Sequence, residues 1–153
     1  MPLKLMYITN NPEIAVIAED AGVDRIFIDM EFIGKDARQG GLDTVQNHHT
    51  IQDIKNIKEV VHQAEIVVRI NPIHEGYLGY MDSKEEIDAA IDAGADILML
   101  PYFTMPEEVE KFVEYVDGRV GTLPLIESAK AVERLDEILK LKGIDQIHIG
   151  LND

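Results

Sequence analysis

The chain has 153 residues and a formal net charge of −15, which argues against nucleic acids and anionic membrane surfaces as partners and favours cations. It contains no cysteine, so disulfide frameworks and thiolate metal sites are excluded. The first residues lack the apolar core of a signal peptide, and no run approaches the roughly 18 apolar residues of a membrane span. We therefore expect a cytoplasmic protein.

Short apolar runs alternate with helical patterns from one end of the chain to the other. We predict six strands, near 3–8, 25–31, 65–71, 97–102, 120–126 and 146–150, with five helices between them. Helix starts are marked by capping residues: Asn11 before Pro12, Thr50, Ser83 with Glu86, and Thr104 with Glu107. Strands that are apolar throughout, such as Ile97-Leu98-Met99-Leu100, are typical of a parallel sheet covered by helices.

One short phrase recurs where a helix gives way to a strand. Ala21-Gly22-Val23-Asp24 returns as Ala93-Gly94-Ala95-Asp96, and more loosely as Lys142-Gly143-Ile144-Asp145. In each copy a glycine closes the helix, an aspartate lies in the turn and a strand follows. We interpret the phrase as the junction of a repeating β/α unit rather than as a binding motif.

The alternation fits either an open doubly wound sheet or a β/α barrel. No glycine-rich phosphate loop follows the first strand, where a dinucleotide-binding fold would carry one, and this favours the barrel. A closed eight-stranded barrel usually needs about 250 residues. We therefore expect residues 1–153 to form about six β/α units of one TIM-barrel domain that continues beyond residue 153 with two further units.

Most of the predicted strands finish in charged or polar side chains, at the end where a β/α barrel builds its site. In chain order the residues at these strand ends are Asp29 and Glu31, Arg69 and Asn71, Pro101, Glu127, and Asp153. A buried strand normally avoids charge, because removing an unpaired ion from water is costly. The pattern therefore predicts a functional site at the carboxyl ends of the strands.

Two carboxylates in this set suit a divalent cation. Glu127 and Asp153 follow the fifth and sixth strands, and neighbouring strands of a sheet lie about 5 Å apart. Carboxylates are hard donors for which Mg²⁺ or Mn²⁺ fits best, with Co²⁺ also compatible, and water and substrate oxygens would complete the coordination. The alternative is that Glu127 is a helix-start carboxylate and Asp153 an ordinary N-cap.

Arg69 and the histidines each carry a functional and a structural interpretation. A guanidinium facing a metal is suited to stabilise an oxyanion, whereas Arg69 could equally form a structural ion pair with Asp29 or Glu31. His48 and His49 lie in the connection 32–49 and His74 in the loop 72–82, and both loops are able to close over a site. The alternative for these three is an exposed loop histidine, and we expect His62 and His148 to be structural.

Several phrases together resemble one known family. They are Phe27-Ile28-Asp29-Met30-Glu31, Val68-Arg69-Ile70-Asn71-Pro72, Ala93-Gly94-Ala95-Asp96 leading to Met99-Leu100-Pro101, Leu125-Ile126-Glu127, and Ile149-Gly150-Leu151-Asn152-Asp153. In order and spacing they resemble the HpcH/HpaI aldolase and citrate lyase β-subunit family over essentially the whole chain. The resemblance implies a TIM barrel of the phosphoenolpyruvate/pyruvate type, commonly assembled as a homo-hexamer.

The resemblance also implies roles for particular residues. Glu127 and Asp153 match the metal-ligating carboxylates of the family, and Arg69 matches its catalytic arginine. Gly150 and Leu151 match the loop whose backbone amides receive the carboxylate of a pyruvate-like substrate.

One position departs from the family pattern. Pyruvate aldolases of the family carry a histidine directly after the glutamate of the second strand, paired with an aspartate on the third helix. Here Phe32 occupies the histidine position, although Asp92 matches the aspartate. We predict that His49 supplies the missing base from its loop, or that the proton leaves through metal-bound water.

The function implied is that of a class II, divalent-metal aldolase, which reversibly cleaves a 2-keto acid into pyruvate and an aldehyde. Met99-Leu100-Pro101 without a following lysine favours this reaction. The Arg-Ile-Asn-Pro phrase instead favours a citryl- or malyl-CoA-type thioester lyase. Phe32 leaves open a third possibility, a metal-binding or assembly subunit without catalysis.

Overall fold

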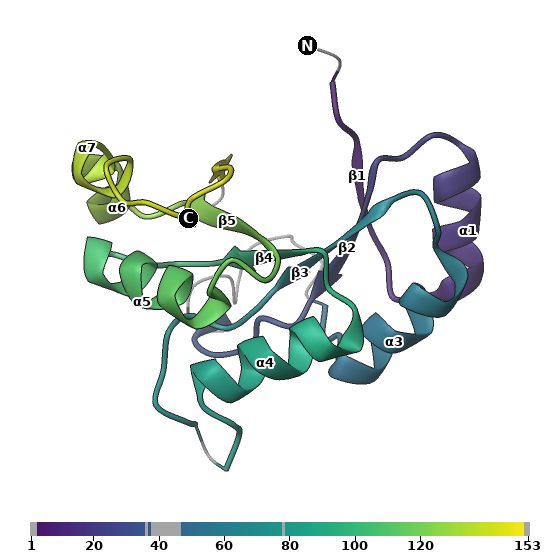
Figure 1. Cartoon of the computed structure of the whole chain (residues 1–153), viewed down its shortest axis with the longest axis horizontal. Coiled ribbons are helices and arrows are strands. Elements are labelled where there is room, and N and C mark those ends of the chain that lie inside the picture. The colour runs from purple at the N-terminus through teal and green to yellow at the C-terminus, as the bar shows by residue number, and fades with distance from the viewer. Residues whose placement is uncertain (1–2, 36, 38–46, 78, 152–153) are drawn as a thin grey trace.

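The computed structural model describes residues 3–35, 37, 47–77 and 79–151, and it shows a curled sheet of six parallel strands (Figure 1). The strands are β1 (Met6–Ile8), β2 (Arg25–Asp29), β3 (Glu65–Arg69), β4 (Ile97–Leu100), β5 (Gly121–Ile126) and β6 (His148–Ile149). They are hydrogen-bonded in chain order, β1 to β6. A doubly wound sheet reverses its strand order, so this topology confirms the barrel interpretation.

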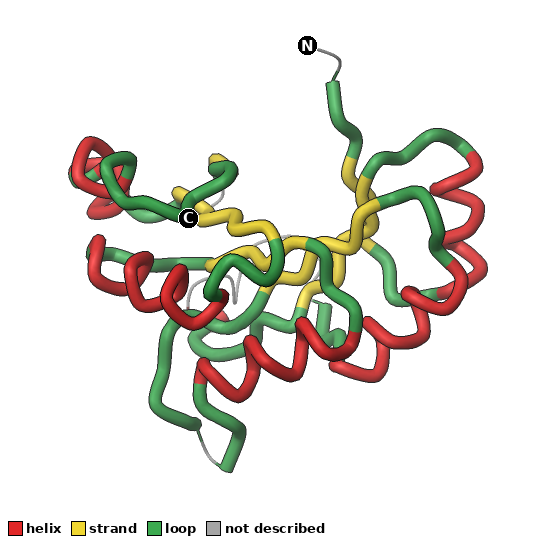
Figure 2. The backbone as a smooth tube through the Cα atoms, in the orientation of Figure 1, coloured by secondary structure: helices red, strands yellow, loops and turns green. Residues whose placement is uncertain are grey.

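Helices cover the convex face of this half-barrel (Figure 2). They are α1 (Pro12–Asp20), α3 (Ile51–Val60), α4 (Ser83–Ala93), α5 (Pro106–Val116), α6 (Ala129–Glu133) and α7 (Leu135–Ile138). A single helix was expected between the fifth and sixth strands, but the structure has two short helices there, α6 and α7. They meet at Arg134, whose φ of −106° and ψ of 14° depart from helical values.

The predicted helix starts are partly confirmed. Asn11 accepts the backbone N–H of Glu13 at 2.9 Å, as an N-cap should, and Thr50 forms a capping box with Asp53. The capping box expected at Ser83 and Glu86 is wrong by one residue, because Asp82 and Glu85 cap α4. Both expected residues are used elsewhere: the Ser83 hydroxyl accepts the backbone N–H of His74, and Glu86 is turned inward.

At α5 the expected pair is likewise displaced by one residue. Pro106 occupies the first helical position, and Glu108, rather than Glu107, accepts the backbone N–H groups of Thr104 and Met105. Proline favours the first helical position because its missing N–H has no partner there.

The recurring glycine and aspartate phrase is structural, as predicted. Each aspartate carboxylate accepts a backbone N–H at or next to the preceding strand: Asp24 from Leu5, Asp96 from Ile66, and Asp145 from Thr122. Gly94 ends α4 with a φ of 115°, which is the left-handed conformation that a residue without Cβ adopts readily. The phrase therefore ties each helix end to the strand before it.

Two apolar clusters lie on opposite faces of the sheet. The larger one fills the space between the sheet and the helices and includes Ile28, Val68 and Leu98. The smaller one lies on the concave face and consists of Val67, Ile97, Met99, Leu123 and Leu125, with Met6 and Phe27 packed against it. Side chains alternate between faces along a strand, so the residue two positions beyond a concave-face residue points to the same side.

None of the helices within the described ranges has the length and apolar character that a membrane crossing requires.

Candidate active site

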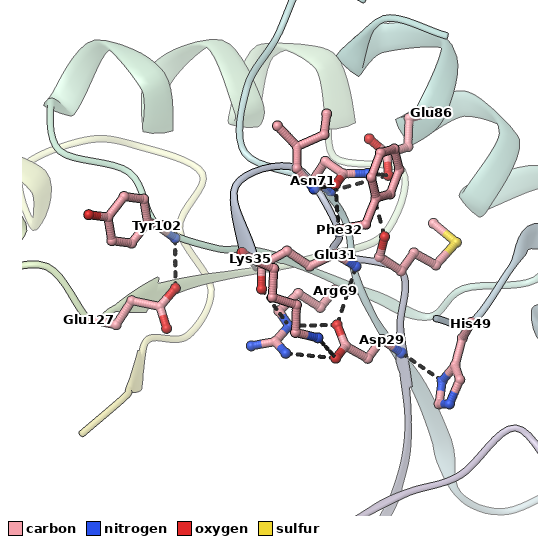
Figure 3. A network of polar contacts seen from close by, with 12 residues as sticks. Asp29, Glu31, Phe32, Lys35, His49, Arg69, Asn71, Glu86, Tyr102 and Glu127 are labelled. Carbon is pink, nitrogen blue, oxygen red and sulfur yellow. Dashed lines mark hydrogen bonds and ion pairs between the residues drawn. The ribbon is translucent and has the colours of Figure 1, made fainter. Parts of the chain in front are cut away.

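Three charged side chains extend the concave face beyond its apolar cluster. Asp29 and Arg69 end β2 and β3, where they are direct partners in the ladder, and Glu127 follows β5. Each lies two positions beyond an apolar concave-face residue, so strand alternation turns all three toward the same side. Figure 3 shows the Arg69 guanidinium between Asp29 and Glu127.

Arg69 is held by a two-point ion pair with Asp29. Its Nε lies 2.8 Å from Asp29 Oδ1 and its Nη2 lies 2.8 Å from Oδ2, while Glu31 Oε2 is 3.5 Å from Nε. The guanidinium carbon also lies 5.5 Å from the centre of the Phe27 ring, within cation–π range. The ion pair with Asp29, one of the two interpretations of Arg69 that the sequence allows, is therefore confirmed. Its geometry fixes the plane of the guanidinium.

Lys35 is a second cation in this network, and the sequence did not predict it. Its side chain is 2% exposed, and its Nζ contacts Asp29 Oδ2. Burial alone would raise the pKa of Asp29, but hydrogen bonds and the positive charges of Arg69 and Lys35 hold it below its usual value. Asp29 and Glu31 thus face two cations, which is the balance that buried charges require.

Arg69 stays positively charged in this buried position. Burial acts to lower its pKa, but the hydrogen bonds and charge of Asp29 and the charges of Glu31 and Glu127 raise it above the usual value. Glu127 therefore acts on Arg69 from the other side of the concave face.

A second polar cluster lies directly behind the first. The fully buried Asn71 accepts the backbone N–H groups of Phe32 and Ile33, each at 2.9 Å, and donates to Glu86 Oε1 at 2.9 Å. Glu86 Oε2 in turn lies 3.3 Å from His74 Nε2. Burial raises the pKa of Glu86, although Asn71 and His74 act in the opposite direction.

Phe32, at the position expected for a histidine, packs under the loop that follows β3. Its ring meets Tyr80 edge-on, with centroids 5.1 Å apart, and lies 6.3 Å from the Tyr77 ring. Burial, with the charge of Glu86, raises the pKa of Tyr80 to about 12. The Phe32 ring is thus enclosed by aromatic neighbours, on the Asn71 side of the network (Figure 3).

Glu127 is partly buried, and the backbone orients it. Its Oε1 accepts the N–H of Tyr102 at 2.8 Å, and Tyr102 has the unusual φ of 38°, a strained conformation of the kind that clusters at functional sites. A Cβ added to Gly150 would lie 3.0 Å from Glu127 Cβ and 3.3 Å from Oε2. Glycine therefore keeps the space beside the carboxylate open, while Leu151 is 90% exposed.

Asp153 lies outside the described residues, so its approach to Glu127 stays a prediction. Within the described ranges, no group of three or more His, Cys, Asp or Glu side chains is arranged to hold a metal ion. The donor chemistry of Glu127, a partly buried carboxylate beside Gly150, nevertheless suits a hard divalent cation that has few protein ligands.

His49 is bound to the backbone of Asp29 rather than to its side chain. Its ring Nδ1 accepts the backbone N–H of Asp29 at 2.9 Å, and the backbone N–H of His49 donates to the Asp29 carbonyl at 3.0 Å. Burial lowers the pKa of His49, although the charge of Asp29 opposes the shift, so the neutral ring predominates at pH 7. The ring lines a pocket of about 430 Å³ together with Met30, Phe32 and Tyr80.

Asp92 is not brought to this cluster within the chain. It is exposed in the last turn of α4, close to Asp96, which bonds the backbone near the start of β3. That turn lies at the opposite end of the strands from Arg69. The first turn of α4 instead contributes Glu86, a residue whose spacing from Ser83 predicts a capping box.

The family model that matches the sequence is that of the HpcH/HpaI aldolase/citrate lyase family, over residues 4–153. None of the curated proteins matches the sequence. Among solved structures, a protein of the same family from Burkholderia cenocepacia J2315 is 19% identical, with a TM-score of 0.69 over 96% of this chain and 63% of that one.

Two further solved structures are similar. Citrate synthase SbnG is 16% identical, with a TM-score of 0.69 over 96% of this chain and 60% of that one. Phosphonopyruvate hydrolase in complex with oxalate and Mg²⁺ is 17% identical, with a TM-score of 0.65 over 97% and 58%. At these identities the likeness shows the fold, a curled part of a TIM barrel of the phosphoenolpyruvate/pyruvate type. The chain spans roughly three-fifths of their lengths.

Proposed function

The chain belongs to the HpcH/HpaI aldolase/citrate lyase family, and we propose that it acts as a metal-dependent carbon–carbon lyase. The proposed reaction is the reversible cleavage of a 2-keto acid into pyruvate and an aldehyde. The observation that carries the proposal is the position of Arg69, clamped by Asp29 on one side with Glu127 across the concave face.

The fixed guanidinium suits this chemistry. Removing a proton from C3 of pyruvate places negative charge on the keto oxygen, and a preoriented cation stabilises that charge without having to reorganise. Nε and Nη2 of Arg69 are engaged by Asp29, so the opposite edge of the guanidinium faces the side of Glu127 (Figure 3). Arg69 is therefore proposed as the oxyanion-stabilising residue.

Glu127 and Asp153 are the proposed ligands of a divalent cation. When bound there, Mg²⁺ or Mn²⁺ would polarise the keto group and make the C3 proton more acidic. Phosphonopyruvate hydrolase, which shares the fold, was solved with oxalate and Mg²⁺, and this supports the choice of metal. The backbone amides of Gly150 and Leu151 are proposed to receive the substrate carboxylate.

For the C3 proton we propose His49 as acceptor. Its lowered pKa keeps the ring neutral at pH 7, and a neutral ring is the form that a general base requires. The enclosure of Phe32 by Tyr77 and Tyr80 supports a base that comes from elsewhere than that position. To act, His49 must release the Asp29 N–H from Nδ1, so substrate binding has to shift the ring.

The test is proton exchange at C3 of pyruvate in D₂O, followed by NMR with Mg²⁺ and without an aldehyde. We expect exchange that chelator abolishes, that Arg69→Lys slows by roughly a hundredfold, and that His49→Gln also slows. Arg119→Lys is the matched control, since Arg119 pairs with Asp88 on the surface. Exchange that continues unchanged in chelator would overturn the proposal.

A citryl- or malyl-CoA-type thioester lyase is the second candidate, favoured by the buried Asn71 of the Arg-Ile-Asn-Pro phrase. Cleavage that requires a CoA thioester, with free 2-keto acids inert, would identify it. Complete absence of exchange with folded, metal-loaded protein would instead indicate a non-catalytic subunit.

A further inference from the structure

The chain turns sharply after β2, and the Asn71 side chain holds that turn. Asn71 Oδ1 accepts two consecutive backbone N–H groups, those of Phe32 and Ile33. A hydrogen bond between backbone groups, from Lys35 N to Phe32 O at 3.2 Å, closes the turn. Gly34 in this turn has a φ of 73°. The turn brings Lys35 back toward β2, where its Nζ contacts Asp29.

Glu86 fixes the orientation of the Asn71 amide. Its Oε1 accepts from Asn71 Nδ2 at 2.9 Å and from the Asn71 backbone N–H at 3.1 Å. The two N–H groups of the turn require an acceptor, so the amide oxygen must face the turn and the amide nitrogen must face Glu86 Oε1. Both residues are fully buried, where misoriented polar groups are costly.

We propose that Asn71 and Glu86 form a clasp that positions Lys35 on Asp29 and thereby fixes the guanidinium of Arg69. Asn71 and Glu86 are positioning residues in this scheme, because their polar contacts are to the turn, the backbone just after β2, the loop after β3 and each other. They act on Arg69 through Lys35 and Asp29. The catalytic consequence rests on the proposed function, whereas the structural one does not.

Lys35 and Arg69 both contact the carboxylate of Asp29. Asp29 Oδ2 receives both Lys35 Nζ and Arg69 Nη2, so the two cations share one carboxylate oxygen. With Lys35 withdrawn, Asp29 would keep only one of the two cations that contact its Oδ2. The guanidinium would then be free to divide its hydrogen bonds between Asp29 and Glu31, and its outer edge would no longer keep one direction.

The direct test is the reactivity of the Lys35 amine with an acylating reagent. The folded chain is labelled, and mass spectrometry of its peptides then quantifies the label at each lysine. Lys58, which is 47% exposed and paired with Asp96, is the internal reference. We expect Lys35 to be protected in the natural sequence and its labelling rate to rise roughly tenfold in Asn71→Asp. The control Asn56→Asp, on α3, should leave Lys35 protected.

Combining Asn71→Asp with Glu86→Gln distinguishes a specific loss of the clasp from a general destabilisation of the fold. In Asn71→Asp two carboxylates face each other, and adding Glu86→Gln restores a donor opposite the new carboxylate. We expect the double variant to recover most of the Lys35 protection, and Glu86→Gln alone to keep it. If Asn71→Asp does not fold, recovery of folding in the double variant is the supporting result.

Three outcomes would overturn the clasp: a folded Asn71→Asp with Lys35 as protected as before, equal labelling in Asn56→Asp, or no recovery in the double variant. In pyruvate proton exchange, Asn71→Asp should lower kcat by roughly a hundredfold with little change in KM, because the guanidinium is misplaced. Unchanged kcat alongside increased Lys35 labelling would overturn the link to Arg69. If the natural chain shows no exchange at all, the proposed function fails and the labelling still decides the clasp.

Discussion

Acids lie at the carboxyl ends of β2 and β3 and, as Glu127, at that of β5, but the two regions are built differently. At β2 and β3, Asp29 is 1% exposed and held by two cations, with a second layer of buried polar contacts behind it. At β5 and β6, Glu127 is partly buried, is oriented by the Tyr102 N–H, and lies against Gly150. The first region pairs a buried carboxylate with two cations of the protein, whereas the second places a partly buried carboxylate beside a glycine.

This difference suggests a division of labour across the concave face. A network in which each buried charge has a partner loses much stability when one member is removed, because the remaining charge stays buried. A partly exposed carboxylate costs little to replace and is the place where an exchangeable ligand can enter. Variants on the β2 and β3 side should therefore report mainly on stability, and those on the β5 and β6 side mainly on metal dependence.

The largest expected effect is that of Arg69→Met. The change removes the guanidinium that contacts the buried carboxylates of Asp29 and Glu31, and we expect the free energy of unfolding at pH 7 to fall by about 3–5 kcal/mol. Urea denaturation measures it. The control Arg119→Met removes an exposed partner of Asp88 and should cost about 1 kcal/mol or less. Similar losses in the two variants would break the contrast.

Glu127→Gln should show the opposite behaviour. The amide oxygen still accepts the Tyr102 N–H, so the free energy of unfolding should change by about 1 kcal/mol or less. Mg²⁺-dependent proton exchange of pyruvate should fall by roughly a hundredfold, because the proposed metal ligand has lost its charge. Full exchange activity in this variant would remove Glu127 from the proposed site.

Gly150→Ala tests whether the position of the Glu127 carboxylate determines the metal dependence. The new Cβ would lie 3.0 Å from Glu127 Cβ and 3.3 Å from Oε2, so the carboxylate must move. We expect the Mg²⁺ concentration for half-maximal exchange to rise roughly tenfold. Gly121→Ala is matched in tightness, with a Cβ 3.1 Å from Ile97 Cγ1, and should lower stability while leaving the Mg²⁺ dependence unchanged.

The smallest effect is a dependence of stability on pH near neutrality. Burial lowers the pKa of His49 beside β2 and of His148 in β6. The folded chain then binds fewer protons than the unfolded chain just below pH 6.5, so stability should fall as the pH drops through that value. The midpoint of urea unfolding at pH 7.5 and pH 5.5 measures this. His49→Gln and His148→Gln should each reduce the slope, and a flat midpoint would contradict the assignment.

A separate loss is expected at lower pH. Because the pKa of Asp29 is held below its usual value, the stability it contributes is present above about pH 4 and is lost as the pH falls through the lowered pKa. The two windows therefore distinguish protonation of the histidines from collapse of the Arg69 network.

The positions of the strands and of the charged residues were sufficient to predict that charge collects at the carboxyl ends of the strands. Asp29, Arg69 and Glu127 each end or follow a largely apolar strand, and that pattern is visible in the sequence alone. The partners of these residues were not visible. Lys35 lies in a polar, glycine-containing connection that gives no sign of burial, and Glu86 has the spacing of an ordinary helix cap.

The sequence by itself determined the order of β/α units, their parallel sheet and the end of the sheet at which charge collects, because these follow from local periodicity and turn chemistry. The tertiary structure decided which charges meet: that Lys35 returns to Asp29, that Glu86 faces Asn71, and that Asp92 stays at the far end of the strands. Such pairings depend on long-range packing of segments that are distant in the chain, and no local pattern encodes them.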